Sequence, residues 1–286
     1  MLLDCGARKI DLSTPVVMGV LNVTPDSFSD GGQWFDPARA LDHAAQMLDE
    51  GATIIDIGGE STRPGAVPVS IEEELRRVIP VISAIAKRVA APISIDTSRA
   101  AVMTAAVDAG AVLINDVWAL RDPGALSAAA ATSAGICLMH MQGAPATMQT
   151  APVYANVVSD VRQFLAERLA ACDKAGIDLA RLIVDPGIGF GKSLEHNLDL
   201  LARLDELAAL ERPLLIGVSR KSTIGAITGR TVDQRLAGGV AFATAAVLAG
   251  ASIIRAHDVA ATVDAVKVAV ALRSRRPALK NNGRER

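Results

Sequence analysis

Short, wholly apolar runs alternate with longer amphipathic runs along most of the 286-residue chain, and this alternation restricts the possible folds to a few. Continuous apolar strands separated by helices indicate a parallel sheet that those helices cover. The predicted strands are Val16–Leu21, Thr53–Ile57, Ile93–Ile95, Val112–Ile114, Ile136–Met139, Leu182–Val184, Leu214–Val218 and Ser252–Ile254. Helical segments follow them, as in Pro37–Glu50, Ile71–Val89 and Leu194–Leu210.

About eight strand–helix units close a parallel sheet into a barrel, and such barrels usually take about 250 residues as one domain. We therefore predict an α/β fold, a single TIM (β/α)8 barrel over residues 1–275, in which the chain before Val16 forms a short hairpin that plugs the bottom. Residues 276–286 are polar, which predicts a disordered tail. An open doubly wound sheet is the main alternative, but the Gly-rich dinucleotide-binding sequence that it needs after the first strand is missing.

Three glycines support the barrel, because each ends a predicted helix directly before a predicted strand. Gly51, Gly110 and Gly250 are each followed by Ala and then by a strand. Glycine readily adopts the left-handed conformation that closes a helix, so these tight turns mark the bottom of the barrel. The longer polar turns that follow the strands mark its top.

The composition excludes several classes of ligand. Half of the residues are hydrophobic and the formal net charge is −2, which favours neither a nucleic-acid surface nor a polybasic membrane anchor. The uncharged segment Leu236–Ile254 is long enough to span a membrane, but Gly250 interrupts it and its end predicts a strand. We interpret it as a well-buried helix suited to a subunit interface.

The cysteines and the N-terminus predict a cytoplasmic protein. Cys5, Cys137 and Cys172 lack the short spacings of metal sites, and an odd number suits a disulfide framework poorly. The first residues contain no apolar core of a signal peptide. We therefore expect three reduced thiols and a small-molecule ligand, with no membrane and no nucleic acid as partner.

Polar residues follow every predicted strand, on the side where barrels keep their chemistry. A single one of them could simply cap a helix, but many polar groups at one mouth are costly unless a ligand or mutual hydrogen bonds satisfy them. In chain order they are Asn22, Asp56, Asp96, Asn115 with Asp116, His140, Asp185, Ser219 with Lys221, and Arg255 with His257.

Two parts of this ring predict different ligand groups. Asp96, Asn115 and Asp185 suit a flat heterocycle with an exocyclic amine and a ring N–H, because a carboxylate accepts from two adjacent donors. The alternative is that both aspartates cap the helices that follow them. Arg255 and His257 alternate on one strand face and predict an anion site, above all for phosphate. Asn22 lies across the barrel closure and could complete that site, through Mg²⁺.

Three further segments lie near this mouth. The run Asp185–Lys192 is Gly-rich but lacks P-loop spacing, so we interpret it as a turn that hugs the backbone. The segments Thr24–Gly32 and Glu60–Ala66 have the composition of active-site lids, which ordinary surface loops share.

These motifs, in this order, resemble those of the dihydropteroate synthases of bacterial folate synthesis. The resemblance runs from about Ile10 to Ala260. It differs from the usual pattern at Arg99, where Lys is common, and at Ala256, where Val is common. The matching motifs are Asn22–Gly32, Asp56–Gly65, Ser94–Thr97, Ile114–Val117, Met139–Gly143, Asp185–Gly191 and Ser219–Ser222.

The resemblance implies an enzyme that joins 4-aminobenzoate to 6-hydroxymethyl-7,8-dihydropterin pyrophosphate, with sulfonamides as competitors. It implies catalytic roles for Asp96, Asp185, Lys221, Arg255 and His257. It implies a pterin site at Asp96, Asn115, Val117, Met139, Asp185, Gly217 and Lys221. It implies a pyrophosphate site at Asn22, Thr62, Arg63, Arg255 and His257, with Mg²⁺ at Asn22. It implies an aminobenzoate site at Phe28, Thr62, Pro64, Phe190, Lys221 and Ser222. A homodimer through the last helices is also implied.

Two other functions would use a similar pterin grip. One is the pterin domain of a corrinoid-dependent methyltransferase, and the other is a pterin-binding protein without catalysis. The long first loop and the Arg255/His257 pair argue against the methyltransferase, since that chemistry has no pyrophosphate to bind. The complete anion and lid motifs argue against a binding protein without catalysis. For the synthase we expect a dissociative displacement, because Arg255 and His257 would stabilise the leaving group and Asp96 and Asp185 the pterin cation. The pterin ester binds first, and the carbon–oxygen bond breaks before the amine attacks.

Overall fold

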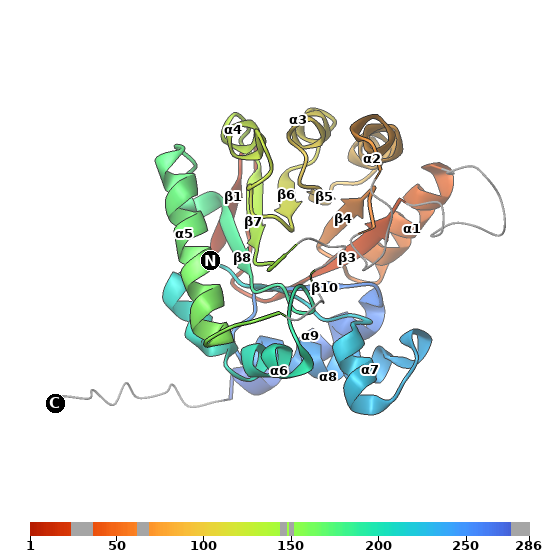
Figure 1. Cartoon of the computed structure of the whole chain (residues 1–286). Helices are drawn as coiled ribbons and strands as arrows, with labels where there is room; N and C mark the ends of the chain where they lie inside the picture. The colour runs from red at the N-terminus through yellow and green to blue at the C-terminus, as the bar shows by residue number, and fades with distance from the viewer. Residues whose placement is uncertain (24–36, 62–68, 144–147, 149–151, 276–286) are drawn as a thin grey trace.

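Parallel strands form a closed ring in the computed structural model, which describes residues 1–23, 37–61, 69–143, 148 and 152–275 (Figure 1). The eight-stranded sheet has the order β8-β7-β6-β5-β4-β3-β10-β9, and a bridge between Val184 and Leu214 joins its two ends. The strands are β3 (Val16–Asn22), β4 (Ile54–Gly58), β5 (Ile93–Asp96), β6 (Leu113–Asp116), β7 (Gly135–Met139), β8 (Leu182–Asp185), β9 (Leu215–Gly217) and β10 (Ile253–Ala256). The predicted (β/α)8 barrel is confirmed, with each strand at its predicted place.

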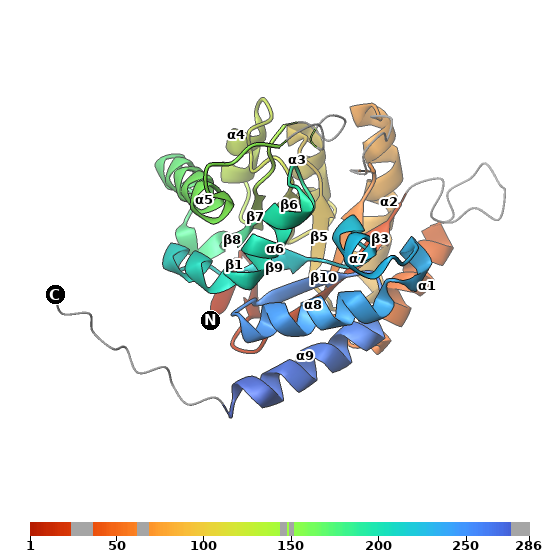
Figure 2. The same cartoon turned by 60° about the horizontal axis from the view of Figure 1, so that its bottom comes forward.

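Helices surround the ring and cover its outer face (Figure 2). They are α1 (Pro37–Asp49), α2 (Ile71–Arg88), α3 (Ala100–Asp108), α4 (Ala125–Ala130), α5 (Val157–Lys174), α6 (Leu194–Ala202), α7 (Ser222–Thr228), α8 (Leu236–Leu248) and α9 (Val259–Arg273). Short 3-10 turns cover Leu179–Arg181, Leu204–Leu210 and Val232–Gln234. Local sequence explains several helix starts: Ser70, Asn156 and Ser193 each cap a helix by accepting from a backbone N–H three residues on.

The prediction of one helix over Leu194–Leu210 is wrong. Helix α6 ends at Ala202, Arg203 leaves the helical region at φ −122° and ψ 30°, and a 3-10 helix takes over. Leu204 and Leu207 are buried, and a helix with three residues per turn places both on one face.

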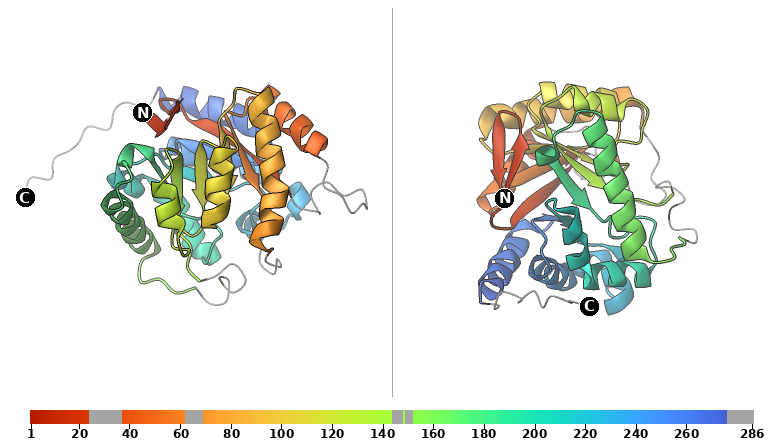
Figure 3. Two further views of the ribbon diagram at one scale, coloured as in Figure 1. Left: turned by 90° about the horizontal axis from the view of Figure 1, so that it is seen from above. Right: turned by 90° about the vertical axis from the view of Figure 1, so that its left-hand side faces the viewer.

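An N-terminal hairpin closes the bottom of the barrel, as predicted (Figure 3). Strands β1 (Leu2–Cys5) and β2 (Arg8–Asp11) pair in antiparallel register. The hairpin contributes Leu3, Cys5, Ile10 and Leu12 to a buried cluster. Their partners come from the start of the barrel strands and are Met18, Ile54, Leu113, Cys137, Ile183, Leu215 and Ile253.

The glycine turns at this end also match the prediction. Gly51, Gly110 and Gly250 have φ of +102°, +116° and +107°. An L-residue is strained in this conformation, so glycine allows the chain to turn sharply between the end of each helix and the strand that follows.

Each barrel strand runs from this apolar layer to the polar mouth, and the alternation of its side chains decides which residues face the barrel interior. Successive side chains point to opposite faces of a strand, so residues two apart face the same side. Leu113 and Ile183 lie in the bottom cluster, and two residues further along are Asn115 and Asp185. The same spacing places the polar residues of the mouth directly above a sealed hydrophobic floor.

Helix α8 differs from its predicted burial. It is 13 residues long, and its buried residues are Ala243, Ala246 and Val247, whereas Leu236 is 47% exposed. Helix α8 packs against α9, which lies beside it in Figure 2. Among the helices of the described residues, none is long and apolar enough to cross a membrane.

Candidate active site

A pocket opens at the carboxyl ends of the strands, and most of the predicted site residues line it. It encloses about 500 Å³, counted out to its open mouth. The predicted residues that line it are Asp96, Asn115, Val117, Met139, Asp185, Phe190, Gly217, Lys221, Arg255 and His257. The pocket is also lined by four residues for which no substrate contact was predicted: Val20, Gly187, Ile188 and Ser219. Val20 could have been found from strand alternation, because it lies two residues before Asn22.

Arg255 forms the ionic centre of this pocket. Its Nε lies 2.6 Å from Asp56 Oδ2, and its Nη2 lies 2.7 Å from Asp96 Oδ2. Burial alone would lower the pKa of Arg255, but the two carboxylates outweigh it and raise that pKa. The guanidinium therefore stays charged and joins the predicted pterin carboxylate Asp96 to the predicted anion site.

Asp56 and Asn115 form the layer beneath this pair. Asn115 Nδ2 donates to Asp56 Oδ2 at 3.1 Å, and Asp56 is fully buried. Among the described residues, Asp56 Oδ1 has no hydrogen-bond partner. This interaction fixes the orientation of the Asn115 side chain, whose two ends would otherwise be interchangeable.

Asp185 accepts a hydrogen bond from its own turn and caps no helix. Its Oδ1 accepts from Gly187 N at 2.7 Å, whereas Ser193 caps the following helix α6. Burial raises the pKa of Asp185 to about 6, and the Gly187 N–H and the nearby Lys221 oppose that rise. The alternative that Asp185 caps a helix is wrong, and its carboxylate faces the pocket.

Lys221 and Phe190 lie together on one side of the mouth. The Lys221 Nζ lies 4.1 Å from the centroid of the Phe190 ring, a cation–π contact. Burial lowers the pKa of Lys221 to about 8, and Asp185 partly offsets that effect. This wall offers a flat apolar surface and a positive charge side by side.

His257 lies next to Ser219 at the end of the last strand. Ser219 Oγ lies 3.1 Å from His257 Nδ1 and accepts from the His257 backbone N at 3.2 Å. The serine hydroxyl therefore fixes one edge of the imidazole. Asp185, Arg255 and His257 all line the same pocket, as the predicted ring and anion sites require.

A strained backbone segment after β6 places Val117 in the pocket wall. Ala119 and Leu120 both have positive φ, 54° and 58°, which costs an L-residue about 1–2 kcal/mol each. Asp116 Oδ2 accepts from Leu120 N at 2.6 Å, and Arg168 Nε donates to Ala119 O at 2.8 Å. The buried Asp116 thus shapes the loop beside the pocket.

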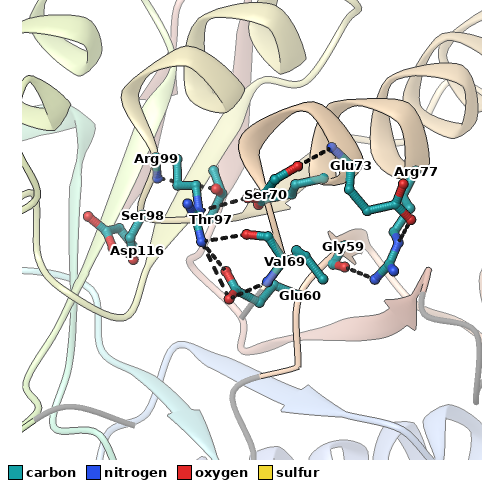
Figure 4. Close-up of polar contacts among 11 residues, drawn as sticks. Gly59, Glu60, Val69, Ser70, Glu73, Arg77, Thr97, Ser98, Arg99 and Asp116 are labelled. Carbon is teal, nitrogen blue, oxygen red and sulfur yellow. Dashed lines mark hydrogen bonds and ion pairs between the residues drawn. The ribbon is translucent and has the colours of Figure 1, made fainter. Parts of the chain in front are cut away.

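A charged cluster links Glu60 and Val69, which lie on either side of residues 62–68 (Figure 4). Arg99 Nη2 donates to Val69 O at 2.9 Å and lies 3.3 Å from Glu60 Oε2. Its Nε lies 3.3 Å from Glu74 Oε2, and burial raises the pKa of Glu74. Arg99, which stands where Lys is common, therefore makes several contacts from one guanidinium.

Several predicted contacts lie outside the described residues or at the rim. Phe28, Thr62, Arg63 and Pro64 fall in the segments that the structure does not describe. So does the predicted tail at 276–286. Asn22 ends β3 and is half-buried, and Ser222 begins α7 and is exposed.

Comparisons with known proteins agree with this geometry. A family model described as "Pterin binding enzyme" matches residues 18–257. A dihydropteroate synthase of Escherichia coli (strain K12) is 53% identical over 94% of this chain and 95% of that protein. The solved Yersinia pestis dihydropteroate synthase with a sulfonamide drug complex is 52% identical, with a TM-score of 0.92 over 96% of this chain and all of that one. The Xanthomonas albilineans enzyme in complex with 7,8-dihydropteroate is 49% identical, with a TM-score of 0.88 over 97% of this chain and all of that one.

Proposed function

The chain belongs to the pterin binding enzymes and, within them, to the dihydropteroate synthases, and we propose that it does the chemistry of that name with the residues described above. It joins 4-aminobenzoate to 6-hydroxymethyl-7,8-dihydropterin pyrophosphate and so serves folate synthesis. The products are 7,8-dihydropteroate and pyrophosphate. The observation that carries the proposal is the convergence of Asp96, Asp185, Lys221 and Arg255 on one pocket.

The pterin ring is bound through its donors and its flat faces. The Asp185 and Asp96 carboxylates accept from ring N–H groups and the exocyclic amine, and the Asn115 amide pairs with the remaining edge. Val117 and Met139, both buried in the pocket wall, pack on the ring faces. Gly217 leaves room for the ring because it has no side chain.

The chemical step transfers the pterin methylene from oxygen to nitrogen. The carbon–oxygen bond to pyrophosphate breaks first, and its electron pair leaves with the pyrophosphate. Arg255 and His257 stabilise the growing negative charge, while Asp96 and Asp185 stabilise the cationic pterin methylene. The amine nitrogen of 4-aminobenzoate then attacks that carbon and loses a proton. Lys221 and Phe190 hold the aromatic acid, together with Ser222 at the rim.

We propose that Mg²⁺ binds near Asn22, on the leaving-group side of the site. Asn22 Oδ1 lies 3.8 Å from where a Cβ on Gly58 would stand and is an oxygen of the kind that Mg²⁺ prefers, whereas the neighbouring Asp96 Oδ2 is paired with Arg255 at 2.7 Å. Among the described residues, no group of three or more acidic, His or Cys side chains could hold a metal, so the substrate would supply further ligands. Bound near Asn22, Mg²⁺ would neutralise charge on the pyrophosphate. Removal of Mg²⁺ with EDTA should abolish turnover, and added Mg²⁺ should restore it.

We also propose a homodimer that works in the cytoplasm. Large apolar side chains are exposed on and beside the last helices, including Leu236 and Val268 at 47% and 57%. Cys5, Cys137 and Cys172 are free and buried, which suits a reducing compartment.

A coupled assay of pyrophosphate release, with chromatography of the pterin product, tests the function. With both substrates, the purified chain should form dihydropteroate and pyrophosphate in equal amounts. A dissociative step also predicts slow pyrophosphate release from the pterin ester alone. Methyl transfer to a corrinoid without any dihydropteroate would instead identify a methyltransferase.

A further inference from the structure

Lys192 is a buried cation that lies behind the pocket wall and has no part in the chemistry proposed above. It follows the Gly-rich turn directly and is 2% exposed. Its Nζ lies 2.9 Å from each of three acceptors: Gly187 O, Phe190 O and His140 Nδ1. An ammonium has three N–H donors, so these contacts satisfy the group completely.

The charges around Lys192 favour this arrangement. Burial, together with the nearby Lys192, lowers the pKa of His140 to about 2, so the imidazole is neutral and its Nδ1 accepts. Burial also lowers the pKa of Lys192 to about 7, while the nearby Asp185 raises it and Lys221 lowers it. The lysine thus contributes hydrogen bonds to backbone carbonyls from a position that water does not reach.

Lys192 binds the part of the turn that faces the pocket. Other side chains hold the rest of the turn: Asn197 Oδ1 accepts from Gly189 N at 2.7 Å, and Tyr154 OH donates to Gly191 O at 2.7 Å. The two carbonyls that Lys192 binds belong to Gly187 and Phe190, which both line the pocket. Phe190 in turn contacts Lys221.

We propose that Lys192 is a positioning residue for the aromatic substrate. By joining His140 on the β7 side to Gly187 and Phe190 on the turn, it holds the Phe190 ring against Lys221, where the carboxylate-bearing ring of 4-aminobenzoate binds. This inference rests on the proposed function, because it assigns Phe190 to the aminobenzoate pocket.

Lys192→Met tests the proposal, because methionine fills similar space and donates no hydrogen bond. The KM for 4-aminobenzoate should rise about tenfold, while kcat changes less than about threefold, because the lost hydrogen bonds hold the pocket wall and do not involve the reacting atoms. General loss of folded protein would lower the apparent kcat and leave KM unchanged. Tyr154→Phe is the matched control: it removes one hydrogen bond to the outer end of the same turn and should leave KM within about twofold.

A pair of His140 variants covers the case in which Lys192→Met does not fold. His140→Leu removes the acceptor and should raise the same KM about tenfold, whereas His140→Asn keeps an acceptor oxygen and should restore most of the affinity. Unchanged KM values in folded Lys192→Met or His140→Leu would overturn the role of Lys192. If the unaltered chain formed no dihydropteroate in the same assay, the proposed function itself would be wrong.

Discussion

At the scale of single residues, the pocket depends on one guanidinium between two buried carboxylates. Burial raises the pKa of Asp96 to about 7, and the nearby Arg255 opposes that rise while its Nε pairs with Asp56. Arg255 therefore has two roles, one in bridging the Asp56 and Asp96 carboxylates and one in stabilising the leaving pyrophosphate.

Arg255→Ala should damage catalysis strongly. We expect kcat/KM to fall at least about 30-fold, because a donor to the developing charge is lost. This corresponds to a rise of about 2 kcal/mol in the activation free energy. Steady-state kinetics with the pterin ester varied would measure this. Arg203→Ala is a suitable control, since Arg203 pairs with Glu206 on the surface at 2.7 Å and should leave kcat/KM unchanged. If kcat/KM fell by less than about threefold in Arg255→Ala, the proposed role of Arg255 would be wrong.

Replacing Asp185 should raise the stability of the protein and lower its activity. Its pKa is raised in the folded chain, so the folded state binds its proton more tightly than the unfolded state does. This stabilisation is complete below the ordinary aspartate pKa and is lost as the pH rises from about 4 through about 6. The difference corresponds to at most about 3 kcal/mol.

Asp185→Asn should therefore stabilise the free protein at pH 8 and nearly abolish turnover. Thermal unfolding measured from pH 4 to pH 8 should show a smaller loss of Tm on the alkaline side in the variant than in the unaltered chain. A variant whose Tm is lower at pH 8 and equal at pH 4 would show that the carboxylate stabilises the fold, and the prediction would then be wrong.

At the scale of secondary-structure elements, the Gly-rich turn after β8 is the tightest part of the site. Gly187 has φ of +67°, and a Cβ there would collide with the carbonyl oxygen of His140. Gly176 and Gly229 also have positive φ, of +82° and +69°, but a Cβ on either would meet nothing within 4 Å. An alanine at Gly176 or Gly229 would therefore cost only backbone strain, whereas an alanine at Gly187 would cost backbone strain and a steric collision.

Gly187→Ala should destabilise the chain far more than the two controls. Backbone strain alone predicts about 1 kcal/mol for Gly176→Ala and Gly229→Ala, and the added collision should bring Gly187→Ala to at least about 3 kcal/mol. Urea unfolding would measure these differences. Equal losses at all three positions would mean that the turn can move away from His140 at little cost.

The elements also show how far sequence alone could reach. The strand positions and the three bottom glycines were predictable because both depend on local patterns, such as apolar runs and a Gly next to a strand. The break at Arg203 was not, because it depends on where Leu204 and Leu207 meet their tertiary partners. The Asp56–Arg255–Asp96 interaction was also missed. It joins residues 159 and 199 positions apart, and only ring closure brings them together.

At the scale of the whole molecule, the barrel leaves one feature unexplained by its own fold. The uncharged helix α8 was predicted to be buried, yet Leu236 is exposed, and Val268 and Leu272 of α9 are 57% and 53% exposed. Exposure of apolar side chains to water is unfavourable, and full burial of one this size contributes about 1.5–3 kcal/mol. Each of these is already about half-buried, so covering it with a second copy would contribute about half of that. In a C2 dimer the same residue of both copies lies in the interface, so each of these positions would contribute two buried side chains.

The double variant Leu236→Arg with Val268→Arg should therefore weaken the homodimer. Sedimentation should give the unaltered chain twice the 29.7 kDa mass of one copy and shift the variant toward a single copy at low micromolar concentration. Val153→Arg, at a residue that is 75% exposed in another part of the chain, should leave the dimer intact. Because Leu236 and Val268 do not line the pocket, the dissociated variant should keep most of its activity per active site. An unaltered chain that sediments as a single copy would exclude the homodimer, and the apolar side chains of α8 and α9 would then need another partner.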